Sequence, residues 1–262
     1  MIASTLLGTV PPRLPARLLV AFAGEFGIAA GTTRTALSRM VDKGELRHLD
    51  AGEYELDGAL LARHLRQEAG LHPVTHPWDG TWELHVVPPG ARSSADRAAL
   101  RRAADHLGLW ERRDGVWMRP ANLDSGRLPA ARAVVAAQTE AYVASPVEDP
   151  AAILASLHDL AGWAGRAGDL IAELDETGAA LAAPDRLADG FVLAAAVLRH
   201  LVTDPLLPPE LEPEGWPARR LREAYGAYLV DYQSGLRVFF RRHTTSDGSV
   251  PRVGGPGPTM TP

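Results

Sequence analysis

Cysteine is absent from the 262-residue chain, and lysine occurs once, at Lys43. Without cysteine the chain has no disulfide framework, no thiolate metal site and no cysteine nucleophile. The start, Met1 to Val10, lacks a basic region followed by a sufficient apolar run, and no later stretch has the roughly 20 apolar residues that a membrane span needs. We therefore expect a cytoplasmic protein that does not contact a membrane.

Catalytic signatures are missing as well. The chain has no Gly-x-Ser-x-Gly elbow, no His-Glu-x-x-His zinc motif and no phosphate-binding loop. His72 and His76 have a spacing that would suit a metal on a helix, but Pro73 and Pro77 forbid that helix. We predict that the protein is not an enzyme, and that it has no catalytic residues, no metal site and no cofactor.

What is present is an ordinary globular composition, 46% hydrophobic and 23% charged, with a net charge of -5. Any affinity of such an acidic chain for nucleic acid must come from a local basic patch. Its length allows two or three small domains. We predict an α+β protein with a winged helix-turn-helix at residues 1–72, a central α+β domain at 73–145, a helical domain at 146–243 and a disordered tail at 244–262.

The predicted boundaries follow changes in the sequence pattern. The prolines of residues 72–77 end the first block, and period-two alternation marks a strand from Thr81 to Val87. The central block continues with a helix from Ser94 to Leu107 and a hairpin whose turn is Asp114-Gly115. After Pro146 the pattern predicts three amphipathic helices, at Pro150–Leu174, Asp185–Thr203 and Trp216–Arg241. The tail is rich in Gly, Pro, Ser and Thr and has no periodicity.

The segment from Leu14 to Lys43 has the pattern of two helices joined by a tight glycine turn. A supporting helix is predicted from Leu14 to Phe26 and a second helix from Thr32 to Lys43. One face of the second helix, with Ala36, Leu37, Met40 and Val41, can bury against Leu18, Leu19 and Phe22 of the first. Gly44 ends it, and Leu46–Leu49 and Tyr54–Leu56 flank an Ala51-Gly52 turn, which predicts a wing.

The opposite face of the second helix is short, rich in hydroxyls and cationic. Such a face suits a helix in the major groove of DNA, where arginine pairs with guanine and Ser or Thr reaches phosphates or bases. The candidate DNA contacts are Thr32, Thr33, Arg34, Thr35, Ser38, Arg39, Lys43 and Arg47. Winged helices also serve as protein-interaction modules, and Asp42, Glu45, Asp50 and Glu53 dilute the positive charge near the wing. That alternative stays open.

Three motifs in order resemble the PaaX family, regulators typified by the repressor of phenylacetate degradation genes. The first comprises Leu6-Leu7-Gly8, Phe26-Gly27-Ile28 and the segment Arg34 to Met40, with Gly44 and Leu46. The second comprises Trp78 to Trp82 with Arg97, Leu100, Leu107-Gly108 and Gly115 to Pro120. The third comprises Asp204 to Leu211, Pro213 and Trp216 to Arg219.

The resemblance implies a ferredoxin-like central domain and a homodimeric repressor of an aromatic or carboxylic acid catabolic operon. It implies release from double-stranded operator DNA by an acyl-coenzyme A thioester such as phenylacetyl-coenzyme A. The candidate effector contacts are Arg112, Arg113, Trp117, Arg199 and Arg219. Tryptophans such as Trp82, Trp117 and Trp216 are more often core anchors than ligand platforms. A metal-dependent nuclease related to the central fold is the enzymatic alternative, but the strand that would carry its aspartate ends Val86-Val87-Pro88-Pro89, without an acid.

Overall fold

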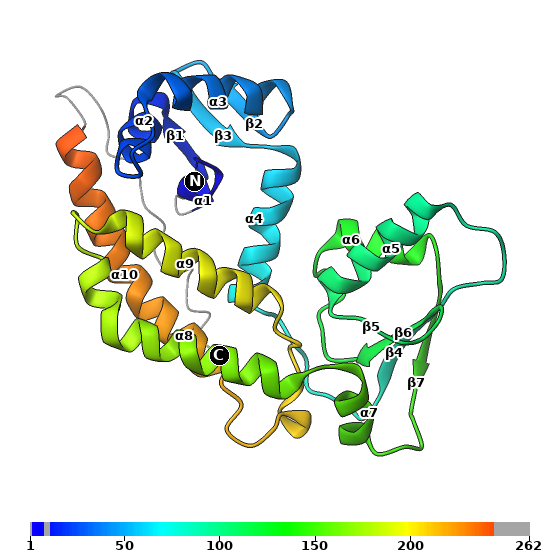
Figure 1. Ribbon diagram of the computed structural model, residues 1–262. Helices are drawn as coiled ribbons and strands as arrows, with labels where there is room; N and C mark the ends of the chain where they lie inside the picture. Colours follow the sequence, from blue (N-terminus) through cyan, green and yellow to red (C-terminus); the bar gives the residue numbers. More distant parts are fainter. Residues whose placement is uncertain (1, 8–10, 244–262) are drawn as a thin grey trace. The chain divides into compact units, whose positions relative to one another are not determined.

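The computed structural model of the chain describes residues 2–7 and 11–243 and divides it into two compact units (Figure 1). Of the described residues, the first unit holds 2–7, 11–65, 168–198 and 220–243, and the second holds 66–167 and 199–219. Helices and two antiparallel sheets are both present, so the predicted α+β class is confirmed. The domain boundaries at 72/73 and 145/146 stay predictions, and the predicted disordered tail, 244–262, lies outside the described residues.

The first unit begins with the element order of a winged helix-turn-helix. Two helices of the expected kind are present, together with a three-stranded antiparallel sheet in the order β1-β3-β2. The third strand of that sheet, β1, was not expected, because it has three residues and ends on a proline. The elements are α1 (Ile2–Leu7), β1 (Arg13–Pro15), α2 (Ala16–Gly24), α3 (Ala30–Asp42), β2 (Leu46–Leu49), β3 (Glu53–Leu56) and α4 (Gly58–Leu71).

An aromatic cluster ties the winged helix to the C-terminal helices within the first unit. The ring of Phe22 on α2 meets those of Phe26, Phe191 and Phe239 edge-on, with ring centroids 5.5, 6.1 and 5.8 Å away. Phe191 comes from α9 (Leu187–Val202) and Phe239 from α10 (Ala218–His243). Edge-to-face pairs of this kind stabilise a core beyond the area that they bury. The winged helix therefore shares its core with helices that lie far away in the sequence.

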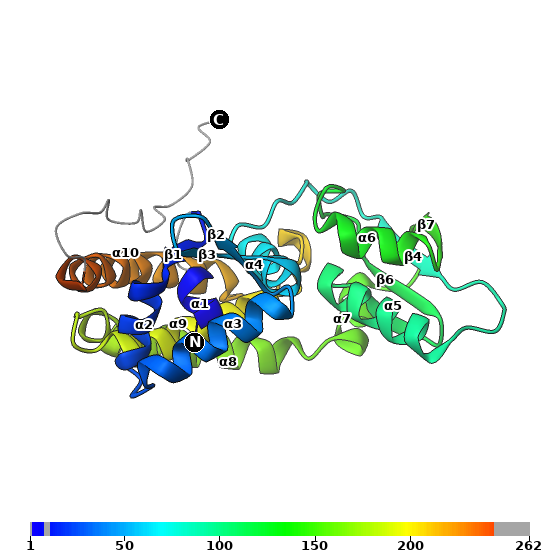
Figure 2. The ribbon, with the colours of Figure 1, turned by 90° about the horizontal axis from the view of Figure 1, so that it is seen from above.

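Helices α8 (Leu160–Leu181), α9 and α10 lie side by side in both views of the ribbon (Figure 2). The hydroxyl of Tyr228 on α10 donates to the carbonyl oxygen of Gly190 at 2.8 Å, and that of Tyr232 donates to Leu187 at 3.2 Å. The predicted single helix from Pro150 to Leu174 is wrong. It is α7 (Pro150–Leu157) and then α8, because His158 is extended and Asp159 accepts a hydrogen bond from the backbone of Gly162, as a helix cap does.

The second unit contains a four-stranded antiparallel sheet in the order β5-β6-β4-β7. Its chain order, strand-helix-strand-strand-helix-strand, is that of ferredoxin-like units. The elements are β4 (Trp82–Val86), α5 (Ser94–Leu107), β5 (Trp110–Arg113), β6 (Val116–Pro120), α6 (Pro129–Ala136) and β7 (Glu140–Ala144). The predicted helix from Ser94 to Leu107 is confirmed, whereas α6 and β7 were not expected.

Both faces of this sheet are covered. Trp117 and the buried side chains of α5 and α6 form one cluster, and Trp82, Met118 and α7 form a cluster on the other side (Figure 1). Trp82 and Trp117 are 0% and 5% exposed, so both are core anchors. Trp216 is half-buried and stacks on Trp163 with ring centroids 4.8 Å apart.

Among the described helices, none combines the length and the apolar character needed to cross a membrane.

Candidate nucleic-acid interface and a cavity in the second unit

The turn between α2 and α3 depends on a glycine in the left-handed region. Gly27 has φ +70°, where a side chain would be strained, and the backbone N–H of Ile28 returns to the carbonyl oxygen of Ala23 at 3.1 Å. After this turn α3 begins at Ala30, with Ala29 as its N-cap residue and no side-chain cap. The backbone N–H groups of the first turn are therefore not occupied by a capping side chain, and the positive end of the helix dipole lies there.

Helix α3 buries the face predicted for it. Leu37 is 1% exposed, and Ala36, Met40 and Val41 are half-buried. The candidate contacts on the other face are all exposed: Thr32, Arg34, Thr35, Ser38, Arg39 and Lys43.

Thr33 does not belong with these candidates. It is 1% exposed, and its hydroxyl donates to the carbonyl oxygen of Ala29 at 3.3 Å. Its position is one residue before the exposed Arg34, a rotation of about 100° along the helix, which turns it toward the core. The prediction of Thr33 as a DNA contact is corrected on this point.

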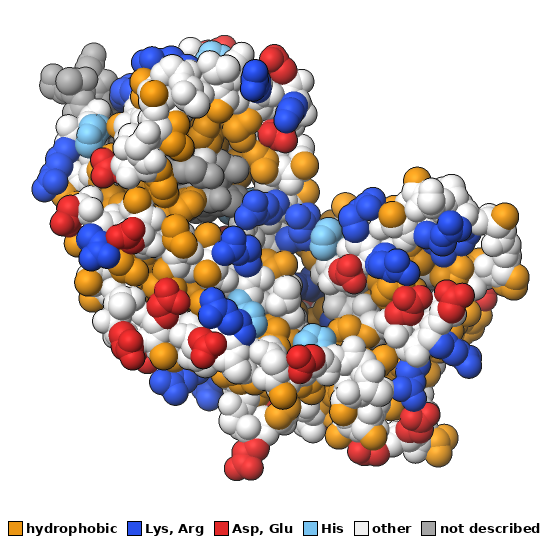
Figure 3. All heavy atoms as spheres, in the orientation of Figure 1, with side chains coloured by type: hydrophobic (Ala, Val, Ile, Leu, Met, Phe, Trp, Pro, Cys, Tyr) orange, Lys and Arg blue, Asp and Glu red, His pale blue; other side chains and the backbone are white. Residues whose placement is uncertain are grey.

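Three cations of α3 and its C-cap are available to a ligand. Arg34, Arg39 and Lys43 make no ion pair and no side-chain hydrogen bond with any of the described residues. Asp42 is exposed on the same helix and lowers the local positive potential. Figure 3 accordingly shows basic and acidic side chains mixed over this part of the surface.

The wing differs, because its cations already have partners. The guanidinium of Arg47 donates to the carboxylate of Glu55, which lies opposite it in the β2-β3 register. Arg13 on β1 lies 3.8 Å from the carboxylate of Glu53. Next to these pairs the rings of His48 and Tyr54 are 4.9 Å apart. Arg47 can bind DNA only by sharing or leaving Glu55, so the positive charge free for a ligand lies on α3.

The five candidate effector residues do not form one site. Trp117 is buried in the core of the second unit, and Arg112 donates to Ser156 at 2.6 Å and to Glu148 at 2.9 Å. Arg113, Arg199 and Arg219 are exposed. A cavity of about 280 Å³ in the same unit has none of the five in its wall. The structure gives no support to these residues as an effector pocket.

The wall of that cavity is formed by α4, the turn from α5 to β5, strand β6, the segment before α6 and the segment before η1 (Pro209–Leu211). The wall contains both apolar and charged side chains. Its charged and histidine residues are Arg66, Asp105, His106, Arg119, Arg127 and Asp204. Burial lowers the pKa of His106, with the charge of Arg66 acting in the same direction, and burial raises the pKa of Asp105. Both shifts favour the neutral form of a side chain beside the arginines.

Arg119 lines this cavity and is 1% exposed. Its guanidinium donates to the carbonyl oxygens of Leu107 at 2.8 Å, Pro205 at 3.3 Å and Leu206 at 3.2 Å, and to the Asn122 amide oxygen at 3.1 Å. Burial lowers its pKa to about 9, and the nearby charge of Glu83 opposes that shift. Arg119 therefore stays protonated at neutral pH, held mainly by carbonyl dipoles.

These contacts give a structural reason for two motifs of the sequence. Arg119 belongs to the segment Gly115 to Pro120, and its partners Pro205 and Leu206 belong to the segment Asp204 to Leu211. Leu206 has φ +49°, an unusual value for a residue with a side chain, and its carbonyl oxygen also accepts from Asn122 at 3.0 Å. Arg119 is not among the functional residues predicted from the sequence, because nothing in a single sequence shows that these two segments meet.

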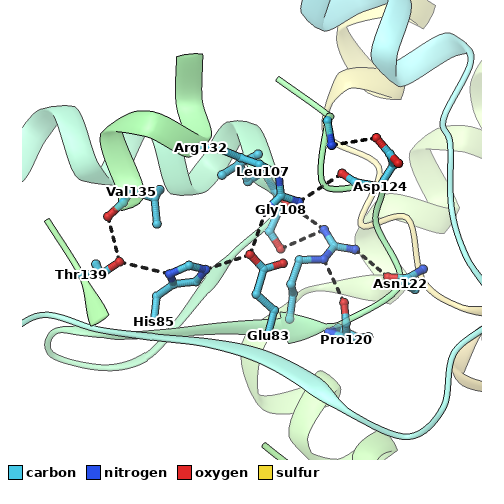
Figure 4. Close-up of polar contacts among 12 residues, drawn as sticks. Glu83, His85, Leu107, Gly108, Pro120, Asn122, Asp124, Arg132, Val135 and Thr139 are labelled. Atoms are coloured by element: carbon cyan, nitrogen blue, oxygen red, sulfur yellow. Dashed lines mark hydrogen bonds and ion pairs between the residues drawn. The ribbon is translucent and has the colours of Figure 1, made fainter. Parts of the chain in front are cut away.

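A second polar cluster lies on the face of β4 that α5 and α6 cover (Figure 4). His85 is 7% exposed and lies between Thr139, at 3.1 Å, and Glu83, at 2.8 Å. Arg132 on α6 donates to the same Glu83 oxygen at 3.0 Å. Among the described residues, no group of three His, Asp or Glu side chains is placed to hold a metal ion.

Comparisons with known proteins agree with the motifs. The family model described as PaaX-like protein matches residues 1–60. A solved structure, that of the uncharacterized protein Rv0674 from Mycobacterium tuberculosis, is 36% identical with a TM-score of 0.68, and the match covers 90% of this chain and 96% of that one. Curated proteins give no match. The winged-helix order of the matched residues and a relative similar over nearly its whole length together show that the chain belongs to the PaaX-like family of transcriptional regulators.

Proposed function

We propose that the protein is a cytoplasmic DNA-binding repressor that acts as a homodimer on double-stranded operator DNA. Exposed Arg34, Arg39 and Lys43, with no partner among the described residues, carry this proposal, because α3 presents them with hydroxyl groups on one face. A helix of this kind inserts its first turns into the major groove. The N–H groups at its start, free of a side-chain cap, favour a DNA phosphate there.

The test is a gel shift with DNA from upstream of the protein's own operon. Arg34→Ala and Arg39→Ala should each weaken binding, and a lost bidentate contact with a base corresponds to about 1–3 kcal/mol, or about five- to 150-fold. The matched control is Arg113→Ala, which removes one exposed positive charge from the second unit. If both α3 variants bind like the wild type, α3 is not the recognition helix. If the wild type itself binds no DNA in this gel shift, a protein-interaction module is favoured instead.

We further propose that the protein represses an aromatic or carboxylic acid catabolic operon and is released by an acyl-coenzyme A thioester. The cavity of the second unit, rather than the five residues expected at first, is the site that suits an anionic, partly apolar ligand. Leu107, Leu109 and Leu128 offer apolar contacts to an acyl group, while Arg66 and Arg127 offer charge to its oxygens. About 280 Å³ suits part of a thioester rather than all of coenzyme A.

The chain provides a direct connection from this cavity to the wing. Helix α4 starts at Gly58, two residues after β3 ends at Leu56, and reaches the cavity wall with Arg66. A ligand that prefers one position of Arg66 therefore acts on the helix that follows the wing. A hundredfold preference for the DNA-free arrangement would shift the equilibrium by about 2.7 kcal/mol.

The effector proposal is tested on the protein–DNA complex. Phenylacetyl-coenzyme A and other acyl-coenzyme A thioesters are titrated into it, with free coenzyme A and the free acids as controls. Arg66→Ala and Arg127→Ala should raise the thioester concentration needed for release, while Arg199→Ala should not. Failure of every thioester to release DNA would remove the effector proposal and leave DNA binding untouched.

A further inference from the structure

Strand β7 forms an unprotected edge of the second unit's sheet. It pairs with β4 in continuous antiparallel register, from Trp82 opposite Ala144 to Val86 opposite Glu140, and within the described residues no strand lies on its other side. Alternate backbone N–H and C=O groups of an edge strand point outward without a strand partner. Such an edge can pair with another chain unless it is protected.

The opposite edge, β5, is protected in three ways. Its sequence, Trp110-Glu-Arg-Arg113, is mostly charged, and its register with β6 is irregular between Glu111 and Arg113. Arg112 is bonded to Ser156 on α7 and to Glu148. Charge, a bulge and covering contacts are the usual devices that keep an edge strand from pairing.

Strand β7 has none of these devices along its middle. Tyr142 is 50% exposed and Val143 is 75% exposed, and as neighbours in a strand they point to opposite faces of the sheet. The only charge of the strand is Glu140 at its start, and its carboxylate accepts a hydrogen bond from the Tyr142 hydroxyl at 2.6 Å. The edge therefore presents apolar side chains on both faces and unpaired backbone between them.

We propose that β7 pairs with β7 of a second copy, antiparallel about a two-fold axis at Tyr142. Under this symmetry Tyr142 lies opposite Tyr142, Ala141 opposite Val143, and Glu140 opposite Ala144. No carboxylate then faces another, and the apolar side chains pair on each face. Parallel pairing in register would instead place Glu140 beside Glu140. The self-complementary charge pattern is the reason to choose a second copy over an unrelated peptide as the partner.

This inference rests on the proposed function, which expects a repressor of two copies. The pairing of the two β7 strands is nevertheless measured without DNA. Because the chain has no cysteine, single cysteines report the register cleanly. Tyr142→Cys should form a disulfide-linked dimer under mild oxidation at low protein concentration. Ala141→Cys and Val143→Cys should cross-link with each other when the two proteins are mixed. Val192→Cys, 60% exposed on α9, is the control that should stay uncross-linked.

Light scattering on the free protein gives a second, independent measurement. Tyr142→Lys places two lysines opposite each other and should weaken dimerisation about tenfold or more, whereas Val192→Lys should not. Ala144→Lys should strengthen it by about three- to tenfold, since each lysine then faces Glu140 of the other copy. A wild type that is monomeric, or one that partners only with another protein, overturns the proposal, as does unaltered dimerisation of Tyr142→Lys. Loss of DNA binding in Arg39→Ala with the dimer intact concerns the proposed function alone.

Discussion

At the scale of single residues, Arg119 is a buried side chain that joins three segments of the second unit. Its planar guanidinium reaches carbonyl groups from three segments at once, Leu107, Pro120 and Pro205-Leu206. The compact ammonium of lysine has three donors and cannot reproduce this fork. We expect Arg119→Lys to lower the free energy of unfolding by about 2–4 kcal/mol, because buried carbonyl groups lose their partners.

Urea denaturation followed by circular dichroism measures this change. The control is Arg102→Lys on α5, an exposed arginine, which should change the free energy of unfolding by less than about 0.5 kcal/mol. A loss for Arg119→Lys as small as that of the control would show that the contacts of Arg119 with Pro205 and Leu206 do not hold the segment before η1 in place.

Residue patterns predicted the winged helix better than they predicted Arg119. The helical period of Leu37, Met40 and Val41 identifies α3 because that periodicity is local and one face is buried. The sequence around an arginine in a strand does not show whether its side chain is exposed or buried. Two partners of Arg119, the carbonyl groups of Pro205 and Leu206, lie 86 and 87 residues away. Thr33 lies four residues before Leu37 and seven before Met40, so the same period places it on the buried face once α3 begins at Ala30.

At the scale of elements, the end of α3 and the start of α4 approach each other through two glycines. Gly44 has φ +67° and Gly58 has φ +47°, and a Cβ at Gly58 would overlap the carbonyl oxygen of Gly44. We expect Gly58→Ala to destabilise the protein by about 1–3 kcal/mol, since both the backbone angle and the space oppose a side chain. Differential scanning calorimetry measures it as a lower Tm.

The matched control is another glycine-to-alanine change in a helix. Gly226 lies on the exposed side of α10, with open space where a Cβ would be and no unusual backbone angle, so Gly226→Ala should stabilise by about 0.4–1 kcal/mol. Two substitutions of identical chemistry should thus shift Tm in opposite directions. Equal shifts would mean that the close approach of α3 and α4 is absent in solution.

Strand β7, helix α6 and the break between α7 and α8 could not be predicted from the sequence pattern. Strand β7 was not expected because its side chains are exposed on both faces, which removes the alternation that identifies a strand, and α6 is short and rich in alanine. The break between α7 and α8 depends on Asp159 acting as a cap, and a helical period continues across it. The C-terminal helices share the core of the winged helix through contacts between residues distant in the sequence, such as Phe22 and Phe239, and a local pattern does not show such contacts.

At the scale of the whole molecule, a net charge of -5 has to be reconciled with the proposed binding to DNA, a polyanion. The structure limits the unpaired cations of the proposed interface to Arg34, Arg39 and Lys43 on each copy, because Arg13 and Arg47 are ion-paired. Two copies then make on the order of six phosphate or base contacts. Release of the counterions should lower the association constant about a thousandfold between 50 and 200 mM salt.

Fluorescence anisotropy with labelled operator DNA over that range gives the slope of log K against log salt, expected to be about -5 for the dimer. Lys43→Ala should bring the slope closer to zero by about one for each copy, and Arg113→Ala should leave it as it is. Tyr142→Lys, if it separates the copies, should about halve the slope, since one copy brings half of the contacts. A slope near zero in the wild type would mean that α3 does not bind the phosphates, whatever holds the two copies together.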